Sequence, residues 1–249
     1  MNWEKLKTFL IVLFSLINVF LIASLILMTQ RGNPISEETI RDTVDILSEN
    51  GITLNEKHIP RPQKAMENIQ LTAMAYTDTF PKSAMRDADG TFTLSYNTVA
   101  KSNRDVKKLL SNSELTLPGL TFDKEFSDGT TYAHQEVSGY EIFGAYLEAR
   151  TTSDGTQLKG IWYSPLSEPV RSDSTGDVVP ITSILIEFIS NPNRPDGEQT
   201  IIDIQYGYHI PSYDSGVTHL TVTAVPSWRI LLSGGEQFYY DARTGEEIT

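Results

Sequence analysis

Histidine and carboxylate side chains are the first candidates for chemistry in this chain, because they bind metals and transfer protons. The four histidines are His58, His134, His209 and His219, and none stands at the spacing of a metal-binding motif such as HExxH. His134 precedes Glu136 by two residues, so on a strand both side chains would point to one face. The pair could form half of a metal site, but a polar strand face more commonly explains such a pair. We therefore predict no metal ligands.

Motifs for nucleophilic or phosphate chemistry are absent from the sequence. The chain has no cysteine, which excludes disulfides, thiolate catalysis and cysteine-based metal sites. It has no G-x-S-x-G elbow, S-x-x-K sequence, P-loop or dinucleotide-binding glycine motif. Two carboxylates could hydrolyse a glycosidic bond, but nothing singles out a pair among the 32 acidic residues. We predict no catalytic residue, no cofactor and no enzyme, and an anchored hydrolase is a minor alternative.

Aromatic residues concentrate late in the chain, where they could line a groove for carbohydrate or peptide. They are Trp162, Tyr163, Tyr206, Tyr208, Trp228, Phe238, Tyr239 and Tyr240. Alternation along strands would bury about half of them in a core. A core role is therefore the default expectation, and the groove is the alternative.

Three polar side chains stand inside a long apolar run near the start of the chain. From Phe9 to Met28 only Ser15, Asn18 and Ser24 are polar. At ~1.5 Å per residue, a helix of this length spans about 30 Å, the thickness of a bilayer core. An amide in a membrane helix normally faces another protein surface and forms a hydrogen bond there. We predict a transmembrane helix over 9–29.

Ser15, Asn18 and Ile22 are the predicted partner-binding residues of this helix. Ser15 lies three residues before Asn18, on the same side of the helix, so that the two form a short polar stripe. The partner could be another protein or a second copy of this chain, giving a homodimer. Without a partner, Ser15 could bond its own backbone.

The residues that flank the apolar run bear on whether it is cleaved and on how it is oriented in the membrane. A cleaved signal peptide has a shorter apolar region and a small-residue cleavage site, which the sequence LILMTQRG lacks. Lys5 and Lys7 before the run balance Arg31 and Arg41 after it, so charge gives almost no orientation. We place residues 1–8 in the cytoplasm as a tail, because a long C-terminal domain can be translocated regardless of its charge. The remainder is then extracytoplasmic in a single-pass protein of the cell membrane.

Composition restricts the partners of that remainder. The chain carries 20 basic and 32 acidic residues, a net charge of −12 at pH 7. Such a surface repels DNA, RNA and anionic lipid headgroups, so we expect no nucleic-acid partner. The charge allows a cation or a basic partner surface, and it also serves simply to keep the domain soluble.

Hydrophobic periodicity predicts helices early and strands late. Ser36 is a good N-cap for a helix that carries Ile40, Val44 and Leu47 on one face and ends near Gly51. The sequence SNRDVKKLLSNS predicts a second helix, and VPITSILIEFISN predicts a short helix or a buried strand. The segments DADGTF and TSDGTQ lack the calcium-loop pattern and predict ordinary Asp-Gly turns.

These elements predict an α+β fold of antiparallel sheets packed with a few helices. A turn-rich stretch suggests a division near Pro118 into an N-terminal α+β part, 30–118, and a mainly β part, 119–249. A helix–turn–strands order recurs weakly in both halves, which suggests two related subdomains.

The sequence resembles the YycI family of regulatory membrane proteins from Gram-positive bacteria. The similarity begins with MNWEKLKTFLIVLFSLINVFLIASL, including Trp3, Lys7 and the stretch Asn18-Val19-Phe20-Leu21. It continues in order through QEVSGYEIFGAYLEA, IIDIQYGYHI and VPSWRILLSGGEQFYYDARTGEE. The ordered set covers most of the chain, with a patchy region between residues 55 and 130. The related YycH family shares the late β pattern but is usually much longer.

The resemblance implies a single-pass protein with an extracytoplasmic domain and no catalytic residues. Family members act with YycH on the sensor histidine kinase of the YycFG (WalKR) two-component system, which controls cell-wall metabolism. Much of that contact is expected through the transmembrane helices. The alternative is an anchored extracytoplasmic module that binds cell-wall polymer or peptide. The sequence does not determine the direction of regulation, the stoichiometry, an ectodomain ligand or the face that meets a partner.

Overall fold

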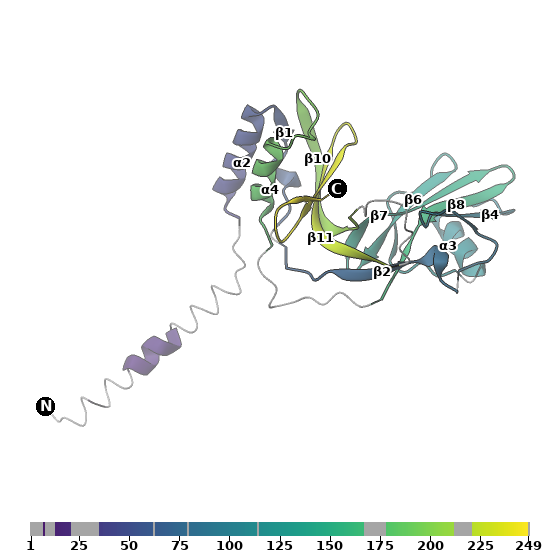
Figure 1. Cartoon of the computed structure of the whole chain (residues 1–249), viewed down its shortest axis with the longest axis horizontal. Coiled ribbons are helices and arrows are strands. Elements are labelled where there is room, and N and C mark those ends of the chain that lie inside the picture. Colours follow the sequence, from purple (N-terminus) through teal and green to yellow (C-terminus); the bar gives the residue numbers. More distant parts are fainter. Residues whose placement is uncertain are drawn as a thin grey trace.

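A computed structural model describes residue 7 and the ranges 13–20, 35–61, 63–78, 80–113, 115–166, 178–211 and 221–248. Over these residues the chain forms an α+β fold built on one large mixed sheet, which confirms the predicted fold class. Figure 1 shows two lobes side by side, with the helical segment 13–20 extending away from one of them.

The lobe beside that segment, here called the terminal lobe, combines early and late parts of the sequence. Its elements are α2 (Glu37–Glu49), β1 (Ile52–Leu54), α4 (Ile181–Ile189), β10 (Gln199–His209), β11 (Thr221–Leu232), β12 (Gln237–Asp241) and β13 (Glu247–Ile248). Strands β10 to β13 form an antiparallel meander, and β1 pairs with β10 in parallel. Helices α2 and α4 lie side by side over one face of this sheet (Figure 1).

The other lobe, here called the central lobe, is an antiparallel sheet covered by α3. Its elements are β3 (Met85–Arg86), β4 (Phe92–Tyr96), α3 (Asn103–Asn112), β5 (Leu120–Phe122), β6 (Thr130–Val137), β7 (Tyr140–Thr152) and β8 (Gly155–Ile161). The strand order is β5-β6-β7-β8-β4-β3. On α3, Val106, Leu109 and Leu110 are buried with the apolar side chains of this sheet.

The lobes are joined through strands that belong to one continuous sheet. The connecting elements are η1 (Glu56–His58), β2 (Ile69–Ala73), η2 (Met74–Tyr76) and β9 (Tyr163–Pro165). Strand β2 pairs with both β11 and β9, and the end of β10 pairs in parallel with the start of β7. Gly207 lies at this crossing, where a Cβ would be 2.5 Å from the carbonyl oxygen of Glu141. The close backbone approach therefore requires glycine.

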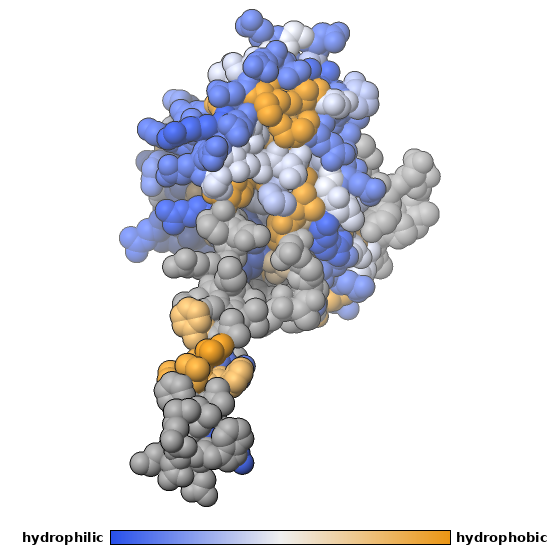
Figure 2. Space-filling model, turned by 90° about the vertical axis from the view of Figure 1, so that its left-hand side faces the viewer, coloured by the Kyte–Doolittle hydropathy of each residue, from blue (hydrophilic) through white to orange (hydrophobic). Residues whose placement is uncertain are grey.

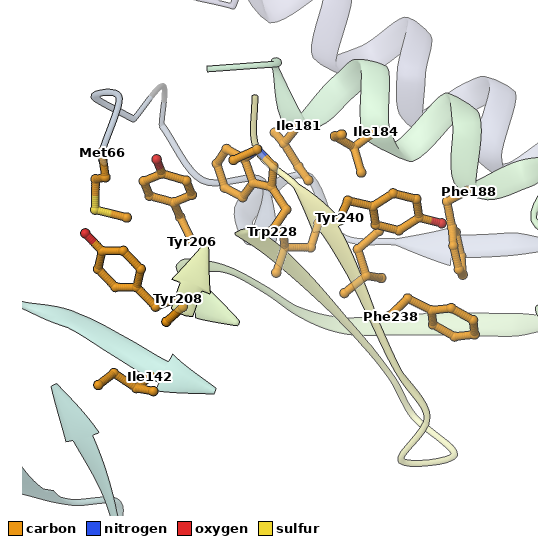
Figure 3. Packing of buried hydrophobic residues seen from close by; sticks show 14 of the residues in the cluster. Met66, Ile142, Ile181, Ile184, Phe188, Tyr206, Tyr208, Trp228, Phe238 and Tyr240 are labelled. Carbon is orange, nitrogen blue, oxygen red and sulfur yellow. The ribbon is translucent and has the colours of Figure 1, made fainter. Parts of the chain in front are cut away.

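Aromatic side chains fill the core of the terminal lobe (Figure 3). Phe188 of α4 packs edge-on against Phe238 with ring centroids 5.1 Å apart. The ring centroids of Trp228 and Tyr206 are 4.9 Å apart. The indole N–H of Trp228 donates to the carbonyl oxygen of Val179, so its buried polar atom is satisfied. Each fully buried large side chain contributes about 1.5–3 kcal/mol to folding.

The local predictions for the helices are confirmed. Ser36 caps α2 by accepting a hydrogen bond from the backbone N–H of Thr39, and Gly51 follows the helix with a φ of +74°. Ser102 caps α3 in the same way. The ambiguous sequence VPITSILIEFISN forms α4, whose apolar residues cover the sheet.

The expectation of antiparallel sheets alone was wrong. Among the described strands, β1 with β10 and β10 with β7 are parallel pairs. Both pairs join segments far apart in sequence, and long connections permit parallel pairing. The division near Pro118 stays a prediction, although elements on either side of it meet closely: α2 packs on α4, and β4 pairs with β8.

The described N-terminal segment is helical and apolar. Residues 13–20 form helix, and their side chains, including those of Ser15 and Asn18, are exposed. Figure 2 shows this apolar segment beside a domain face on which hydrophilic residues predominate. Ile22 and most of the predicted 9–29 span lie outside the described residues. Within the described residues, no helix has the length and apolar character needed to cross a membrane.

Candidate functional site

A polar hollow, here called the junction cleft, lies where β10–β12 of the terminal lobe meet β5–β7 of the central lobe. Two adjoining cavities of about 590 and 450 Å³ share His134, Glu141 and Gln205 in their walls. The polar and charged residues of the cleft include Asp123, His134, Glu136, Glu141, Gln205, Arg229, Gln237 and Tyr239. Both volumes lie within the range of ligand pockets, about 300–1,000 Å³.

Strand register builds the terminal-lobe wall of the cleft. Gln205 of β10 stands opposite Arg229 of β11, and Arg229 stands opposite Tyr239 of β12. Their sequence neighbours Trp228 and Tyr240 point to the other face and are buried in the core. Alternation along three strands thus places a polar row on the face away from α2 and α4.

Arg229 is the central cation of the cleft. Its guanidinium donates to Glu141 at 3.0 and 3.4 Å and to the side-chain oxygen of Gln205. It also lies 4.0 Å from Asp203 and 4.6 Å from the ring centroid of Phe143. The Arg229 side chain is 15% exposed and that of Glu141 is 20% exposed, so the pair is largely removed from water. The fork of Arg229 is therefore already engaged, although its buried Nε has no partner.

His134 is held between two carboxylates on the central-lobe wall. Its Nδ1 bonds Asp123, and its Nε2 lies 3.2 Å from Glu136. Burial lowers the pKa of His134, but the hydrogen bonds to Asp123 and Glu136 and the nearby charge of Glu141 outweigh that effect and raise the pKa above its ordinary value. The predicted placement of His134 and Glu136 on one face is confirmed. Within the described residues no group of three or more side chains is arranged to hold a metal ion.

His209 stacks on Tyr239, one of the residues that line the cleft. Its ring stacks on Tyr239 with centroids 3.9 Å apart, and both ring nitrogens are buried without a hydrogen-bond partner. Burial lowers the pKa of His209 to about 4, so the ring is neutral at neutral pH. The imidazole thus acts as an apolar support for Tyr239.

The late aromatic residues are mainly core residues. The default expectation was a core role for about half of them. Seven of the eight are buried: Trp162, Tyr163, Tyr206, Tyr208, Trp228, Phe238 and Tyr240. Tyr239, which is partly exposed, and the buried Tyr206 line the cleft. The alternative of a groove that uses these aromatics stays a prediction, and in the cleft it would use Tyr239 and Tyr206, because the others line neither cavity.

Sequence reasoning did not single out Arg229, Glu141 or His209. An arginine inside the apolar stretch VPSWRILL was the available signal, because a charged residue flanked by buried ones on a strand must face the opposite side. The contact between Arg229 and Glu141 joins residues 88 positions apart, so only the pairing of β10 with β7 and β11 reveals it. The predicted contact residues Ser15 and Asn18 lie on the N-terminal segment and line neither cavity of the cleft.

Comparisons with known proteins give distant likeness at the level of structure. No protein-family model matches this chain, and no curated protein matches it. The chain is similar to a solved structure of an uncharacterized protein from Eubacterium rectale ATCC 33656, with 11% sequence identity and a TM-score of 0.41. The match covers 80% of this chain and 90% of that chain. A likeness this distant carries no inference about function.

Proposed function

We propose that this protein is a membrane-anchored, non-enzymatic regulator of a sensor histidine kinase of the YycFG (WalKR) type, acting beside a YycH-like partner. In this proposal residues 9–29 span the cell membrane, residues 1–8 are cytoplasmic and the two lobes are extracytoplasmic. The ordered resemblance to YycI supports it. If the transmembrane helices of the kinase pack in two alternative ways, a helix that binds one arrangement more tightly shifts the equilibrium toward it.

The polar pair on an exposed apolar helix carries this proposal. Ser15 and Asn18 are exposed on segment 13–20, among exposed side chains such as Leu16, Ile17 and Phe20. In a bilayer an unpaired amide is costly, so a neighbouring helix that accepts its hydrogen bond would be favoured. Such a bond contributes about 0.6–2 kcal/mol, enough to select a partner or register.

The first folded element offers a route for coupling the anchor to the lobes. Helix α2 starts at Glu37 and packs against α4 and β1 of the terminal lobe. Its Leu47 is fully buried. A displacement that reaches α2 would therefore act on a helix that is packed against the rest of the lobe.

In-cell crosslinking tests the proposal. A photoreactive residue replaces Asn18, and the captured partner is identified by mass spectrometry. Position 16 is the matched control, because it lies about 200° around the same helix. We expect position 18 to capture a sensor kinase or a YycH-like protein, and Asn18→Leu to change phosphorylation of the response regulator. Capture of only copies of this chain, with unchanged phosphorylation, would reject the regulator and favour a homodimer.

The junction cleft favours a second candidate, a module that binds cell-wall polymer or peptide. The cleft combines the ring of Tyr239 with hydrogen-bonding groups from Gln205, Gln237 and Glu141, a combination that suits sugars and peptides. Titration of the full-length chain with purified wall fragments tests it. Tyr239→Ala should abolish binding, whereas Tyr239→Phe keeps the ring and should retain it. Equal binding by the two variants, or no binding by the native chain, would refute this function for the cleft.

A further inference from the structure

The outer edge of β5 is available for pairing with another strand. Strand β5 pairs with β6 in an antiparallel register that sets Thr121 opposite His134, and β6 is its one partner among the described strands. The carbonyl oxygen of Gly119 accepts from Glu136, and the N–H of Asp123 donates to Tyr132. Antiparallel alternation then turns the N–H and C=O groups of the intervening residues, 120 and 122, away from β6.

Helix α3 forms the second wall of a groove beside this edge. A cavity of about 600 Å³ is lined by Asn103, Arg104 and Lys107 of α3 and by Leu120, Thr121 and Phe122 of β5. The opposite face of α3 is buried in the central-lobe core, which fixes the helix in place. The groove therefore has a rigid helical wall, an apolar floor and a strand edge, the arrangement used for strand addition by peptides.

The groove is basic in an acidic protein. The chain has a net charge of −12, yet the charged residues that line the groove are Arg104 and Lys107. The Lys107 ammonium lies 5.5 Å from the ring centroid of Phe122, so it overhangs the β5 side chains. Negative side chains on an added strand would meet these two cations at short range.

Asn103 ties the start of α3 to the end of β5. Its amide nitrogen donates to the carbonyl oxygen of Lys124 at 2.9 Å, and its Oδ1 is buried without a hydrogen-bond partner among the described residues. The bond to Lys124 holds the helical wall beside the strand at one end of the groove.

We propose that the groove between α3 and β5 binds an extended acidic segment of another protein, which adds as a strand to the edge of β5. The backbone groups of Leu120 and Phe122 hold the segment, and Arg104 and Lys107 select its negative side chains. The two apolar β5 side chains pack beneath it. This binding does not use the membrane anchor, and Phe122 is the one residue that lines both this groove and the junction cleft.

A peptide titration of the full-length chain in detergent tests the proposal. The probe is a fluorescent peptide about eight residues long that alternates valine with glutamate, and binding is followed by anisotropy. Two matched probes replace glutamate with lysine or carry N-methyl groups that block strand pairing. We expect each matched probe to bind at least about tenfold more weakly, and the exchange of the Leu120 and Phe122 amide hydrogens to slow on binding of the first probe.

Charge variants separate the groove from general attraction. Arg104→Glu with Lys107→Glu should weaken binding of the glutamate probe at least about tenfold. Lys108→Glu is the control, because Lys108 is on α3 and pairs with Asp105 but does not line the groove. Equal binding of the N-methylated probe, an equal effect of Lys108→Glu, or no binding of the first probe would overturn the proposal. Self-association of the chain that disappears in the double variant would instead assign the groove to a second copy.

Discussion

The ion pair between Arg229 and Glu141 gives the sharpest stability prediction. At 3.0 Å and an effective dielectric constant of about 20, two unit charges attract by about 5 kcal/mol. Removing them from water costs several kcal/mol per ion, which offsets most of this attraction. The intact pair therefore adds little net stability, whereas either charge left alone in the cleft is strongly destabilising.

Single and double substitutions follow from this balance. Glu141→Gln keeps the shape but leaves Arg229 without its main counter-charge, and we expect the free energy of unfolding to fall by about 2–3 kcal/mol. The loss is at the low end for a buried pair because Gln205 and Asp203 remain near the guanidinium. Arg229→Met should cost a similar amount. The double variant should lose no more than either single change, so the coupling energy should be about 2 kcal/mol.

Urea unfolding of the full-length chain in detergent, followed by tryptophan fluorescence, measures these values. The exposed pair Arg41 and Glu37, 4.0 Å apart with 67% and 92% of the side chains exposed, provides the control cycle. Its coupling should be at most about 1 kcal/mol, as for surface ion pairs. A coupling for Arg229 and Glu141 below about 0.5 kcal/mol would refute the reasoning, because it would mean that water screens the cleft as it screens the surface.

Three further predictions concern the histidines and the crossing of the lobes. The pKa of His134 is raised in the folded state, so its ion pairs stabilise the folded chain fully below the unfolded pKa of this group. This stabilisation is lost as the pH rises through the folded pKa. His134→Gln should therefore lower the Tm at about pH 5.5 but not at pH 9. The pKa of His209 is lowered to about 4, so the native chain should lose stability as pH falls from about 6.5 to 4, and calorimetry of His209→Phe should show a weaker pH dependence. Gly207→Ala places a methyl group 2.5 Å from the carbonyl oxygen of Glu141 and 2.8 Å from the ring of Phe143, and urea unfolding should show a loss of about 1–3 kcal/mol. An unchanged pH profile in either histidine variant, or native stability in the glycine variant, would contradict the corresponding assignment.

Much of the local structure could be predicted, because short-range rules govern it. Ser36 and Gly51 bound α2 through capping and a left-handed turn, effects that act within a few residues. Strand β4 follows from the apolar alternation of its residues, and the turns DADGTF and TSDGTQ follow from Asp-Gly. The apolar segment VPITSILIEFISN was ambiguous, since its pattern suits a buried strand as well as a helix. In the structure this segment is the helix α4, which packs against α2 and the sheet.

The candidate sites depend on contacts that no local rule supplies. His134 and Glu136 could be placed together from a spacing of two, but the third member of that group, Asp123, comes from β-pairing. The cleft and the groove beside β5 both require knowledge of which strands pair and which edge remains open. Sheet pairing over long sequence separations is a cooperative property of the whole fold.

The sequence by itself determined the boundaries of α2 and α3, the alternation of the strands, the acidic character and the apolar segment bearing Asn18, because composition and spacing act locally. Only the tertiary structure decided that β1 pairs in parallel with the start of β10 and that β7 pairs in parallel with its end. It also decided that Arg229 meets Glu141, that Tyr239 rests on His209, and that α3 walls the edge of β5. The physical reason is that burial and hydrogen bonding stabilise contacts between distant segments whose apolar surfaces and backbone groups match. That choice is made among all segments of the chain at once.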